Sequence, residues 1–354
     1  MAVHNGEPHL RESIDSILQQ SFTDFEFLII DDASSDHSRD IILSYQDQRI
    51  RFVSNQTKLG LTRSLNRGLR LALGDLIARQ DADDVSERHR LARQRDFLDA
   101  NPQAALVGTW YKKIDERNSD LGTRQLPCDW LEIRWALLFL CPFVHSAVML
   151  RKAILLDKVG VYDESLIYAQ DYELWSRIAH ELPVANLPEY LVRYRMSPRS
   201  MTSTYGDIVQ AETLRTSIAN LAVLIGRAEA TRLVESDAAI ENIRALIFGD
   251  YRRLTTEEAI SAARRSMWLL SAFTRHSEAQ QYSFRVRLRY QIARRLIEIS
   301  RYRATQGLDG VAQLVAEAYR ICWLLLFKRQ SLRALLNLMK QHLPGKPSRS
   351  PRSS

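Results

Sequence analysis

Three aspartates within four residues form the stretch with the clearest chemical potential. Asp81, Asp83 and Asp84 follow the short apolar run Leu76–Ala78, which is typical of a buried strand. In open α/β sheets, ligands bind just beyond the carboxyl ends of the strands. Carboxylates placed there suit a hard divalent cation that takes its other ligands from substrate phosphates. The stretch predicts a metal site or, as an equal alternative, an acidic turn that caps the next helix.

An EF-hand calcium loop is excluded by the residues of the same stretch. Such a loop needs glycine at its sixth position and glutamate at its twelfth. Counted from Asp81, those positions hold Ser86 and Ala92.

A second pair of carboxylates ends another apolar run. Phe25–Ile30 has the composition of a strand, and Asp31 and Asp32 come directly after it. Two strands that both end in aspartate pairs are harder to explain by helix capping than one would be. The two pairs together therefore favour a binding edge of a sheet.

The N-terminal half supplies the elements that would position these side chains. Apolar spacing and breaks predict strands at 1–3, 25–30, 50–53, 76–78, 105–109 and 143–150, and helices at 10–18, 34–45, 61–72, 87–100 and 172–179. This alternation is typical of an α/β fold with a mostly parallel sheet and helices on both faces. Residues 112–140 are less regular, and we expect them to cover the site.

Composition describes an ordinary globular chain. The 354 residues are 45% hydrophobic and 26% charged, with a net charge of +7. The three cysteines follow neither a metal-binding nor a disulfide spacing, which fits a reducing compartment. Neither a secretory signal nor an apolar run of transmembrane length occurs, so we expect a cytoplasmic location.

The charge is unevenly distributed along the chain. Residues 1–210 contain 25 Lys and Arg against 30 Asp and Glu, a net charge of −5, whereas residues 211–354 contain 24 against 12, a net charge of +12. We expect a domain at 1–205, a helical basic region at 206–343 and a disordered tail at 344–354. No nucleic-acid-binding motif accompanies the basic charge, so nucleic acid is not an expected partner.

Residues 321–343 combine an apolar and a basic stripe. Leu332, Leu335, Met339 and Leu343 recur at helical spacing, and Arg329, Arg333 and Lys340 accompany them. Together with the apolar run 321–327, the pattern predicts either peripheral contact with an anionic membrane or a face of a helical bundle with solvated arginines.

Seven short motifs occur in order over residues 1 to about 203. They are Val3-His4-Asn5-Gly6-Glu7, Phe25 to Asp32, Gly60-Leu61 with Asn66-Arg67-Gly68, Ile77-Ala78-Arg79 with Asp81 to Asp84, His145 to Met149, Gln170 to Trp175, and Tyr194-Arg195. Each motif is weak alone, but the ordered set resembles glycosyltransferase family 2. That family comprises inverting nucleotide-sugar transferases of GT-A fold.

The resemblance implies a nucleotide site around the first two motifs. Asp32 would accept a hydrogen bond from the nucleotide base, with a helix cap as the alternative role. His4 would stack on the base, or would be a histidine of a surface turn. Glu7 would also face the nucleotide.

The resemblance gives the three clustered aspartates separate roles. Asp81 would lie near the ribose, and Asp83 would bind Mg²⁺ or Mn²⁺ that bridges the diphosphate. Asp84 would be structural, for example as a cap of the following helix.

The later motifs would supply the residues on the acceptor side of the site. Asp171 matches the general base that deprotonates the acceptor hydroxyl, although it could also be a helix N-cap. His145 would line the acceptor or diphosphate side, or would be a core histidine, and Trp175 would be core. Arg79 and Arg195 would contact phosphate or form structural ion pairs.

Three features depart from the family pattern. The first strand has only about three residues, so the start at Met1 could be a late start or the edge of a fragment. Gln170 stands where a glutamate commonly precedes the base, which removes a neighbouring negative charge. Ser197 stands where the family often has a histidine.

These observations predict a metal-dependent inverting glycosyltransferase of the hexosyltransferase type. It would move a sugar from a nucleoside-diphosphate sugar to a hydroxyl of a glycan or lipid-linked acceptor in cell-surface polysaccharide synthesis. The alternative is a non-catalytic nucleotide-sugar-binding or membrane-scaffold protein with a degraded N-terminus.

Overall fold

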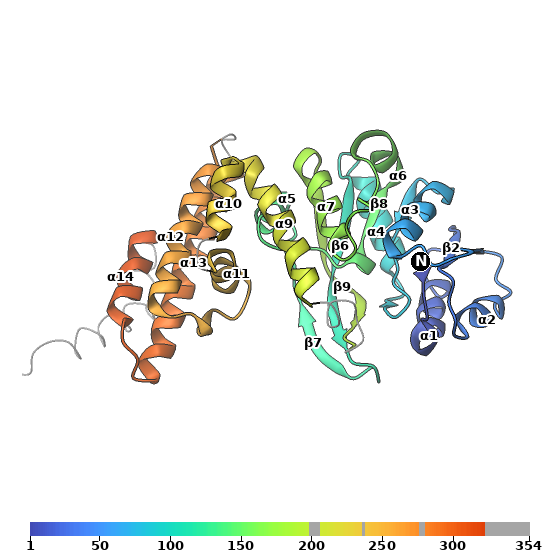
Figure 1. Ribbon diagram of the computed structural model, residues 1–354, viewed down its shortest axis with the longest axis horizontal. Coiled ribbons are helices and arrows are strands. Elements are labelled where there is room, and N and C mark those ends of the chain that lie inside the picture. Colours follow the sequence, from blue (N-terminus) through green and yellow to red (C-terminus); the bar gives the residue numbers. More distant parts are fainter. Residues whose placement is uncertain (198–205, 236–237, 276–279, 323–354) are drawn as a thin grey trace, which may run out of the picture. The chain divides into compact units, whose positions relative to one another are not determined.

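The chain forms two compact units, Met1–Leu221 and Ala222–Ser354. The structure is a computed structural model that describes residues 1–197, 206–235, 238–275 and 280–322 (Figure 1). The first unit is a layered arrangement of strands and helices. The second unit is helical throughout its described part.

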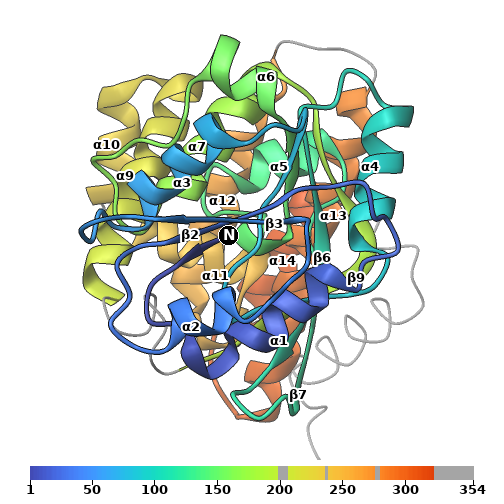
Figure 2. The same ribbon diagram turned by 90° about the vertical axis from the view of Figure 1, so that its right-hand side faces the viewer.

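A small parallel sheet opens the first unit. It is formed in the order β1-β2-β3 by β1 (Ala2–Val3), β2 (Phe27–Asp31) and β3 (Ile50–Ser54). The helices around it are α1 (Glu7–Leu18), α2 (Ser38–Leu43) and α3 (Leu61–Leu71). In Figure 2, α1 and α2 lie on one side of these strands and α3 lies on the other. Accordingly, Ile14 and Ile42 pack with Phe27 and Ile29 of β2, whereas Gly68 of α3 lies against Ile30.

A second, mixed sheet carries most of the first unit. Its strands run in the order β4-β8-β6-β9-β5, with β7 paired to β6. They are β4 (Leu76–Ala78), β5 (Val85–Ser86), β6 (Leu106–Ile114), β7 (Asp120–Arg124), β8 (Met149–Arg151) and β9 (Val184–Arg195). Its helices are α4 (Arg90–Ala100), α5 (Trp130–Ala136), α6 (Lys152–Ile154), α7 (Gln170–Glu181) and α9 (Gly206–Ile225), with a 3₁₀ turn at His145–Ala147 and a π-helical turn at Leu155–Val159.

The two sheets are separated where β2 and β4 face each other. Within the described chain no ladder joins β1 to β4. A cavity of about 430 Å³ lies there, lined by side chains of β2, α3 and β4 that include Phe27, Leu65, Leu69 and Ile77. The β1 residues still pair with β2, because Ala2 lies opposite Ile30 in the parallel register.

The α/β fold class is confirmed, but the sheet is mixed rather than mostly parallel. Only β6–β9 is parallel in the second sheet, while β4–β8, β6–β8, β5–β9 and β6–β7 are antiparallel. Residues 112–140, expected to be irregular, contain the end of β6, all of β7 and α5. The predicted strand at 143–150 is shorter, since His145 lies in the 3₁₀ turn before β8.

The long strand β9 has no counterpart among the predicted elements. Pro188 lies within it, and proline cannot donate to a strand ladder. The structure accommodates it with a bulge, because Thr109 pairs with Leu187 and the next β6 residue, Trp110, pairs with Tyr190. This bulge allows one strand to run from the core at Val184 to the site at Arg195.

The first unit extends beyond the expected boundary at 205. The unit ends at Leu221, so most of α9 belongs to it. The physical reason is a polar seam along α7, in which Ser217 Oγ lies 3.1 Å from Tyr172 Oη and Asn220 Nδ2 donates to Ser176 Oγ at 2.9 Å. Buried polar groups that satisfy one another in this way keep two helices packed together.

The described part of the second unit is a helical bundle. It comprises the end of α9, α10 (Arg227–Glu235), α11 (Ala239–Phe248), a 3₁₀ turn (Tyr251–Arg253), α12 (Thr256–Phe273), α13 (Gln280–Thr305) and α14 (Val311–Ile321). Its core includes the buried Ile243, Leu269, Leu296 and Leu314. Among the residues that the structure describes, no helix has both the length and the apolar character to cross a membrane. The predicted membrane-contact stripe at 321–343 lies outside the described residues after Cys322.

Candidate active site

The acidic loop after β4 is held by groups other than its metal-binding candidates. The buried Gln80 side chain donates to Ser13 Oγ at 3.0 Å and to the Asp84 carbonyl oxygen at 2.7 Å. Ser13 Oγ in turn donates to the Asp81 carbonyl oxygen at 2.7 Å. The loop is therefore fixed through its backbone rather than through the Asp83 carboxylate.

Asp81 is kept ionised by Arg79. The two side chains form an ion pair, and Arg79 is 5% exposed. Burial of Asp81 opposes ionisation, but the Arg79 charge and hydrogen bond outweigh it and lower the pKa of the carboxyl. Of the two roles left open for Arg79, the structure therefore has the ion pair.

Asp84 is structural, as expected, but it does not act as a helix cap. Its buried carboxylate accepts a hydrogen bond from the Arg195 backbone N–H at 2.8 Å and another from Ser146 Oγ. Burial, with the charges of Asp83 and Asp81, raises its pKa well above the ordinary value. Asp84 thus joins the acidic loop to β9 and to the 3₁₀ turn after Val144.

Asp83 has the features that a shared cation site requires. Burial and the negative charge of Asp81 raise the pKa of its carboxyl to about 6. Among the described residues, no side chain forms an ion pair with this carboxylate, so a cation would relieve the repulsion between the two aspartates. The described chain holds no cluster of three or more His, Cys, Asp or Glu suited to a metal ion. A cation held by Asp83 would take its other ligands from phosphates and water.

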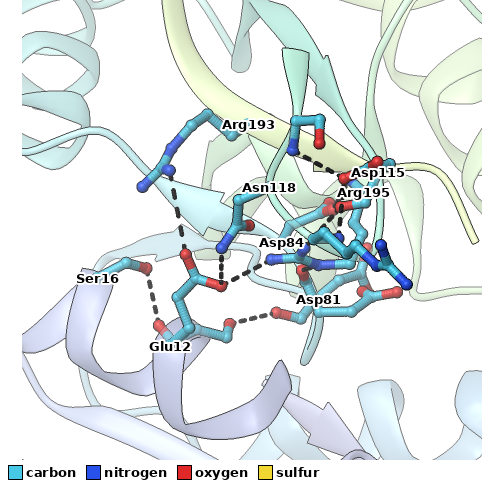
Figure 3. Close-up of polar contacts among 12 residues, drawn as sticks. Glu12, Ser16, Asp81, Asp84, Asp115, Asn118, Arg193 and Arg195 are labelled. Atoms are coloured by element: carbon cyan, nitrogen blue, oxygen red, sulfur yellow. Dashed lines mark hydrogen bonds and ion pairs between the residues drawn. The ribbon is translucent and has the colours of Figure 1, made fainter. Parts of the chain in front are cut away.

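Arg195 binds the acidic loop to two other segments. Its guanidinium donates to the carbonyl oxygen of Asp83, to that of Asp115 and to Glu12 Oε2, each at 2.8 Å (Figure 3). It is 2% exposed, and these bonds use its Nε and both of its Nη atoms. Of the two roles left open for Arg195, the structure therefore has the structural ion pair.

The expected nucleotide residues lie beside this loop. The buried Asp32 carboxylate accepts hydrogen bonds from the backbone N–H groups of Leu59 and Gly60, both at 2.8 Å, and from Asn55 Nδ2 at 2.6 Å. His4 Nδ1 lies 2.9 Å from the Asp32 carbonyl oxygen. These hydrogen bonds, with one from the Ser64 side chain, lower the pKa of the Asp32 carboxyl although its burial opposes this.

Gly6 and Glu7 show what the turn that carries His4 contacts. A side chain added at Gly6 would meet Val3 and, at 3.4 Å, the Cβ of Ala82, so this turn contacts the acidic loop. Glu7 Oε2 accepts a hydrogen bond at 3.2 Å from the backbone N–H of His37, the residue before α2, and its expected contact with the nucleotide stays a prediction.

Asp171 lies in the first turn of α7, where the general base was expected. Burial and the negative charge of Asp81 raise the pKa of its carboxyl to about 6, although its bond from the Tyr172 N–H at 2.7 Å opposes this rise. A carboxylate with this pKa can hold a proton taken from a hydroxyl and release it near neutral pH. The negative charge of Asp81 is among the causes that raise the pKa of both Asp83 and Asp171.

His145 lies in an aromatic cluster at the same site. Its Nε2 is 2.9 Å from Tyr162 Oη, and its ring meets Tyr162 and Trp175 edge to face. Burial and the Arg79 charge lower the pKa of His145 to about 3, so the ring is neutral at physiological pH. Trp175 is fully buried, which confirms its expected core position.

The residues that hold the site together were not found from the sequence. Glu12, Ser13, Gln80, Asn55 and Ser146 each bond a segment distant in the chain. They are common polar residues on helices and loops, and their types carry no motif. Only the three-dimensional fold brings them to their partners.

Solved structures share this architecture. One of them, S. aureus TarS 1-349 in complex with UDP, has a TM-score of 0.53 and 18% identity over 90% of this chain and 89% of that one. The match to a longer TarS structure covers 89% of this chain and 54% of that one. The mannosyltransferase PcManGT from Pyrobaculum calidifontis, in complex with GDP-Man and Mn²⁺, has a TM-score of 0.50 and 18% identity over 91% of this chain and 85% of that one. At these identities the likeness concerns the fold.

Sequence comparison supplies the family. The family model described as Glycosyl transferase family 2 matches residues 1–159. An uncharacterised glycosyltransferase of Methanocaldococcus jannaschii is 35% identical over 56% of this chain and 70% of its own length. The putative glycosyltransferase EpsE of Bacillus subtilis is 35% identical over 55% of this chain and 71% of its own length. The amylovoran biosynthesis glycosyltransferase AmsE of Erwinia amylovora is 30% identical over 53% of this chain and 70% of its own length. The chain belongs to glycosyltransferase family 2 and is a transferase of GT-A fold.

Proposed function

We propose that this glycosyltransferase is metal-dependent and inverting, and that it transfers a hexose from a nucleoside-diphosphate sugar. The observation that carries the proposal is the shared electrostatics of Asp81, Asp83 and Asp171. These three carboxylates come from two segments far apart in the chain, and the charge of Asp81 acts on both of the others. Such a group supplies a cation ligand and a separate base, as an inverting transfer requires.

Asp83 would hold Mg²⁺ or Mn²⁺, with Asp81 and Asp32 orienting the nucleotide. When bound, the cation would stabilise the negative charge that develops on the leaving diphosphate. The proposal is supported by the raised pKa of Asp83 and by the Mn²⁺ in the PcManGT complex. The ion pair from Arg79 would keep Asp81 ionised beside the ribose.

Asp171 would act as the general base in a single displacement. Its carboxylate would take the proton of an acceptor hydroxyl while the hydroxyl oxygen attacks the anomeric carbon. The bond from that carbon to the diphosphate breaks, and the nucleoside diphosphate leaves with the electron pair. His145 would line this space as a neutral ring that orients polar groups without adding charge.

The acceptor would be a hydroxyl of a glycan or lipid-linked sugar in cell-surface polysaccharide synthesis. The similarity to AmsE, an amylovoran biosynthesis glycosyltransferase, supports this assignment. The three free cysteines support a reducing, cytoplasmic location.

Calorimetric titration with nucleotides tests the donor site. UDP, GDP and dTDP are titrated with and without Mn²⁺ into the wild type, Asp83→Ala and the control Asp99→Asn, whose side chain is exposed on α4. We expect one nucleotide to bind with Mn²⁺, and binding to be lost in Asp83→Ala but kept in the control. Failure of every nucleotide to bind a well-folded sample would contradict the proposal.

Turnover separates the enzyme from its alternative. With the donor sugar that matches the bound nucleotide, Asp171→Asn should bind that donor normally but lose transfer. If the wild type binds the donor and transfers nothing to any hydroxyl acceptor or water, the non-catalytic binding protein would be favoured instead.

A further inference from the structure

The loop that leads into α7 is fixed on one side by α3. Asn66 Nδ2 donates to the Tyr162 carbonyl oxygen at 2.9 Å, and the Tyr162 N–H donates back to Asn66 Oδ1 at 3.0 Å. Thr62 Oγ1 donates to the Leu166 carbonyl oxygen at 3.0 Å. These bonds fix the loop up to Leu166, four positions before α7 begins at Gln170.

The last part of the loop is fixed by one carboxylate from α9. Glu212 accepts hydrogen bonds from the backbone N–H groups of three successive residues, Ile167 at 3.1 Å, Tyr168 at 2.8 Å and Ala169 at 2.9 Å. Hydrogen bonds to an ionised acceptor are stronger than those between neutral groups. Glu212 therefore determines the backbone path just before Asp171.

The helix that carries the base lacks a cap of its own. Its N-cap residue is Ala169, which has no side-chain oxygen, and no side-chain capping bond forms there. The first N–H groups of a helix need external acceptors, and negative charge near them is favourable. Glu212, on α9 after β9, accepts the N–H of the N-cap residue Ala169 and brings a negative charge close to this helix start.

Glu212 is itself held in place by the polar seam between α9 and α7. Ser217 and Asn220, one to two turns further along α9, bond to Tyr172 and Ser176 of α7. Asn220 Nδ2 also donates to the Leu137 carbonyl oxygen at 2.5 Å, beside the end of α5. With α9 fixed along its length, the carboxylate of Glu212 cannot drift away from the loop.

We propose that Glu212 is a positioning residue for glycosyl transfer, which aligns Asp171 with the acceptor hydroxyl by holding the amides of residues 167–169. The inference rests on the proposed role of Asp171 as the base. Glu212 acts through the loop backbone and does not touch the substrate. Small displacements of a reacting group have large effects on rate, about 100-fold for a shift of 1 Å.

The test compares four variants with the wild type. Glu212→Ala removes the acceptor, Glu212→Gln keeps one carbonyl oxygen, Asp207→Asn changes the exposed acid near the start of α9, and Asp171→Asn removes the base. For each protein we measure hydrogen exchange of peptides that cover 163–172, affinity for the Mn²⁺–nucleotide complex, and kcat and KM for transfer.

We expect Glu212→Ala to exchange the amides of 167–169 at least about tenfold faster, in line with the loss of charge-assisted hydrogen bonds. Its kcat should fall about 10- to 100-fold, while the nucleotide affinity stays unchanged, because the donor residues lie on other segments. Glu212→Gln should be intermediate in both exchange and kcat. Asp207→Asn should match the wild type, and Asp171→Asn should lose turnover with normal exchange.

Hydrogen exchange, nucleotide affinity and kcat together separate a failure of the positioning role from a failure of the proposed function. Unchanged exchange in Glu212→Ala would overturn the inference, and so would faster exchange with unchanged kcat. An equal loss of nucleotide affinity and kcat would also overturn it, because it would indicate general damage. A wild type that binds nucleotide but transfers nothing would instead refute the proposed function, and the positioning role would fall with it.

Discussion

At the scale of single residues, the ionisation of Asp171 governs the expected rate. Burial and the charge of Asp81 raise the pKa of this carboxyl to about 6. Only the ionised form accepts a proton, so transfer should fall about tenfold for each pH unit below 6 and level off above it. The pH dependence of kcat at saturating donor measures this. A profile that stays flat down to pH 5 would contradict the role of Asp171 as the base.

The same raised pKa means that the ionised form of Asp171 lowers the free energy of unfolding. The folded-state pKa of about 6 exceeds the ordinary value of 3.8, so the folded protein binds this proton more tightly than the unfolded chain. Stability from this group is therefore present at low pH and is lost as the pH rises from about 4 to 6. Asp171→Asn should raise the free energy of unfolding by about 1–3 kcal/mol at pH 7.5 and by less at pH 4. Urea unfolding at both pH values measures this, with Asp99→Asn as the control.

Arg195 offers a test of the loop anchor. Arg195→Lys places one ammonium where three separate acceptors are now satisfied, so the acceptor oxygens of Asp83, Asp115 or Glu12 lose the donor of a buried guanidinium. We expect a loss of about 2–4 kcal/mol in the free energy of unfolding. Arg193→Lys is the matched control, because its contacts with Glu12 and Glu87 are near 4 Å and half-exposed. Equal effects of the two substitutions would show that the buried bonds do not matter.

At the scale of elements, Gly108 of β6 pairs with Asn186 of β9 and leaves no room for a side chain. A methyl group there would overlap Asn186 of β9 and would lie 2.8 Å from Phe143 Cδ1. Asn186 cannot move away freely, because its Nδ2 donates to the carbonyl oxygens of Pro127 and Pro142. Gly108→Ala should therefore lower the free energy of unfolding by about 1–3 kcal/mol. Gly74→Ala, where the nearest atom is at 3.5 Å, should change it little in the same denaturant series.

Elements were predictable where one local pattern dominated. The runs before Asp31 and Asp81 gave the strands β2 and β4, and the spacing of Leu61, Leu65 and Leu69 gave α3. β9 was missed because Pro188 argues against a strand, and only pairing with β6 shows that a bulge absorbs it.

In the candidate site, the carboxylates could be predicted from local sequence, but the residues that support them could not. Asp32, Asp81, Asp83 and Asp171 stand at element ends, where carboxylates in a motif can be recognised from sequence. Their supports cannot be recognised in this way, because residues such as Gln80 and Glu212 gain their roles only from contacts across the fold.

At the scale of the whole molecule, α9 defines where the first unit can be cut. A chain ending at Ile225 keeps Glu212 and the seam with α7, whereas one ending at 205 loses both and exposes polar groups of Tyr172 and Ser176. We expect residues 1–225 to bind nucleotide with Mn²⁺ within about threefold of the full chain, since the contacts that hold the donor site are kept. The shorter chain should unfold at a lower temperature. Thermal unfolding and calorimetry compare the two, and equal melting temperatures would argue against the extended unit.

The bonds of Arg195 also bear on when the site forms during folding. Arg195 meets Glu12, 183 positions earlier in the chain, and Asp83, 112 positions earlier. Contacts between such distant positions form slowly, because the long intervening chain must first be ordered. On a translating ribosome, α1 and the acidic loop must wait for β9 to emerge before this anchor can close. A partly synthesised chain can therefore hold its local helices and strands well before it holds a rigid donor site.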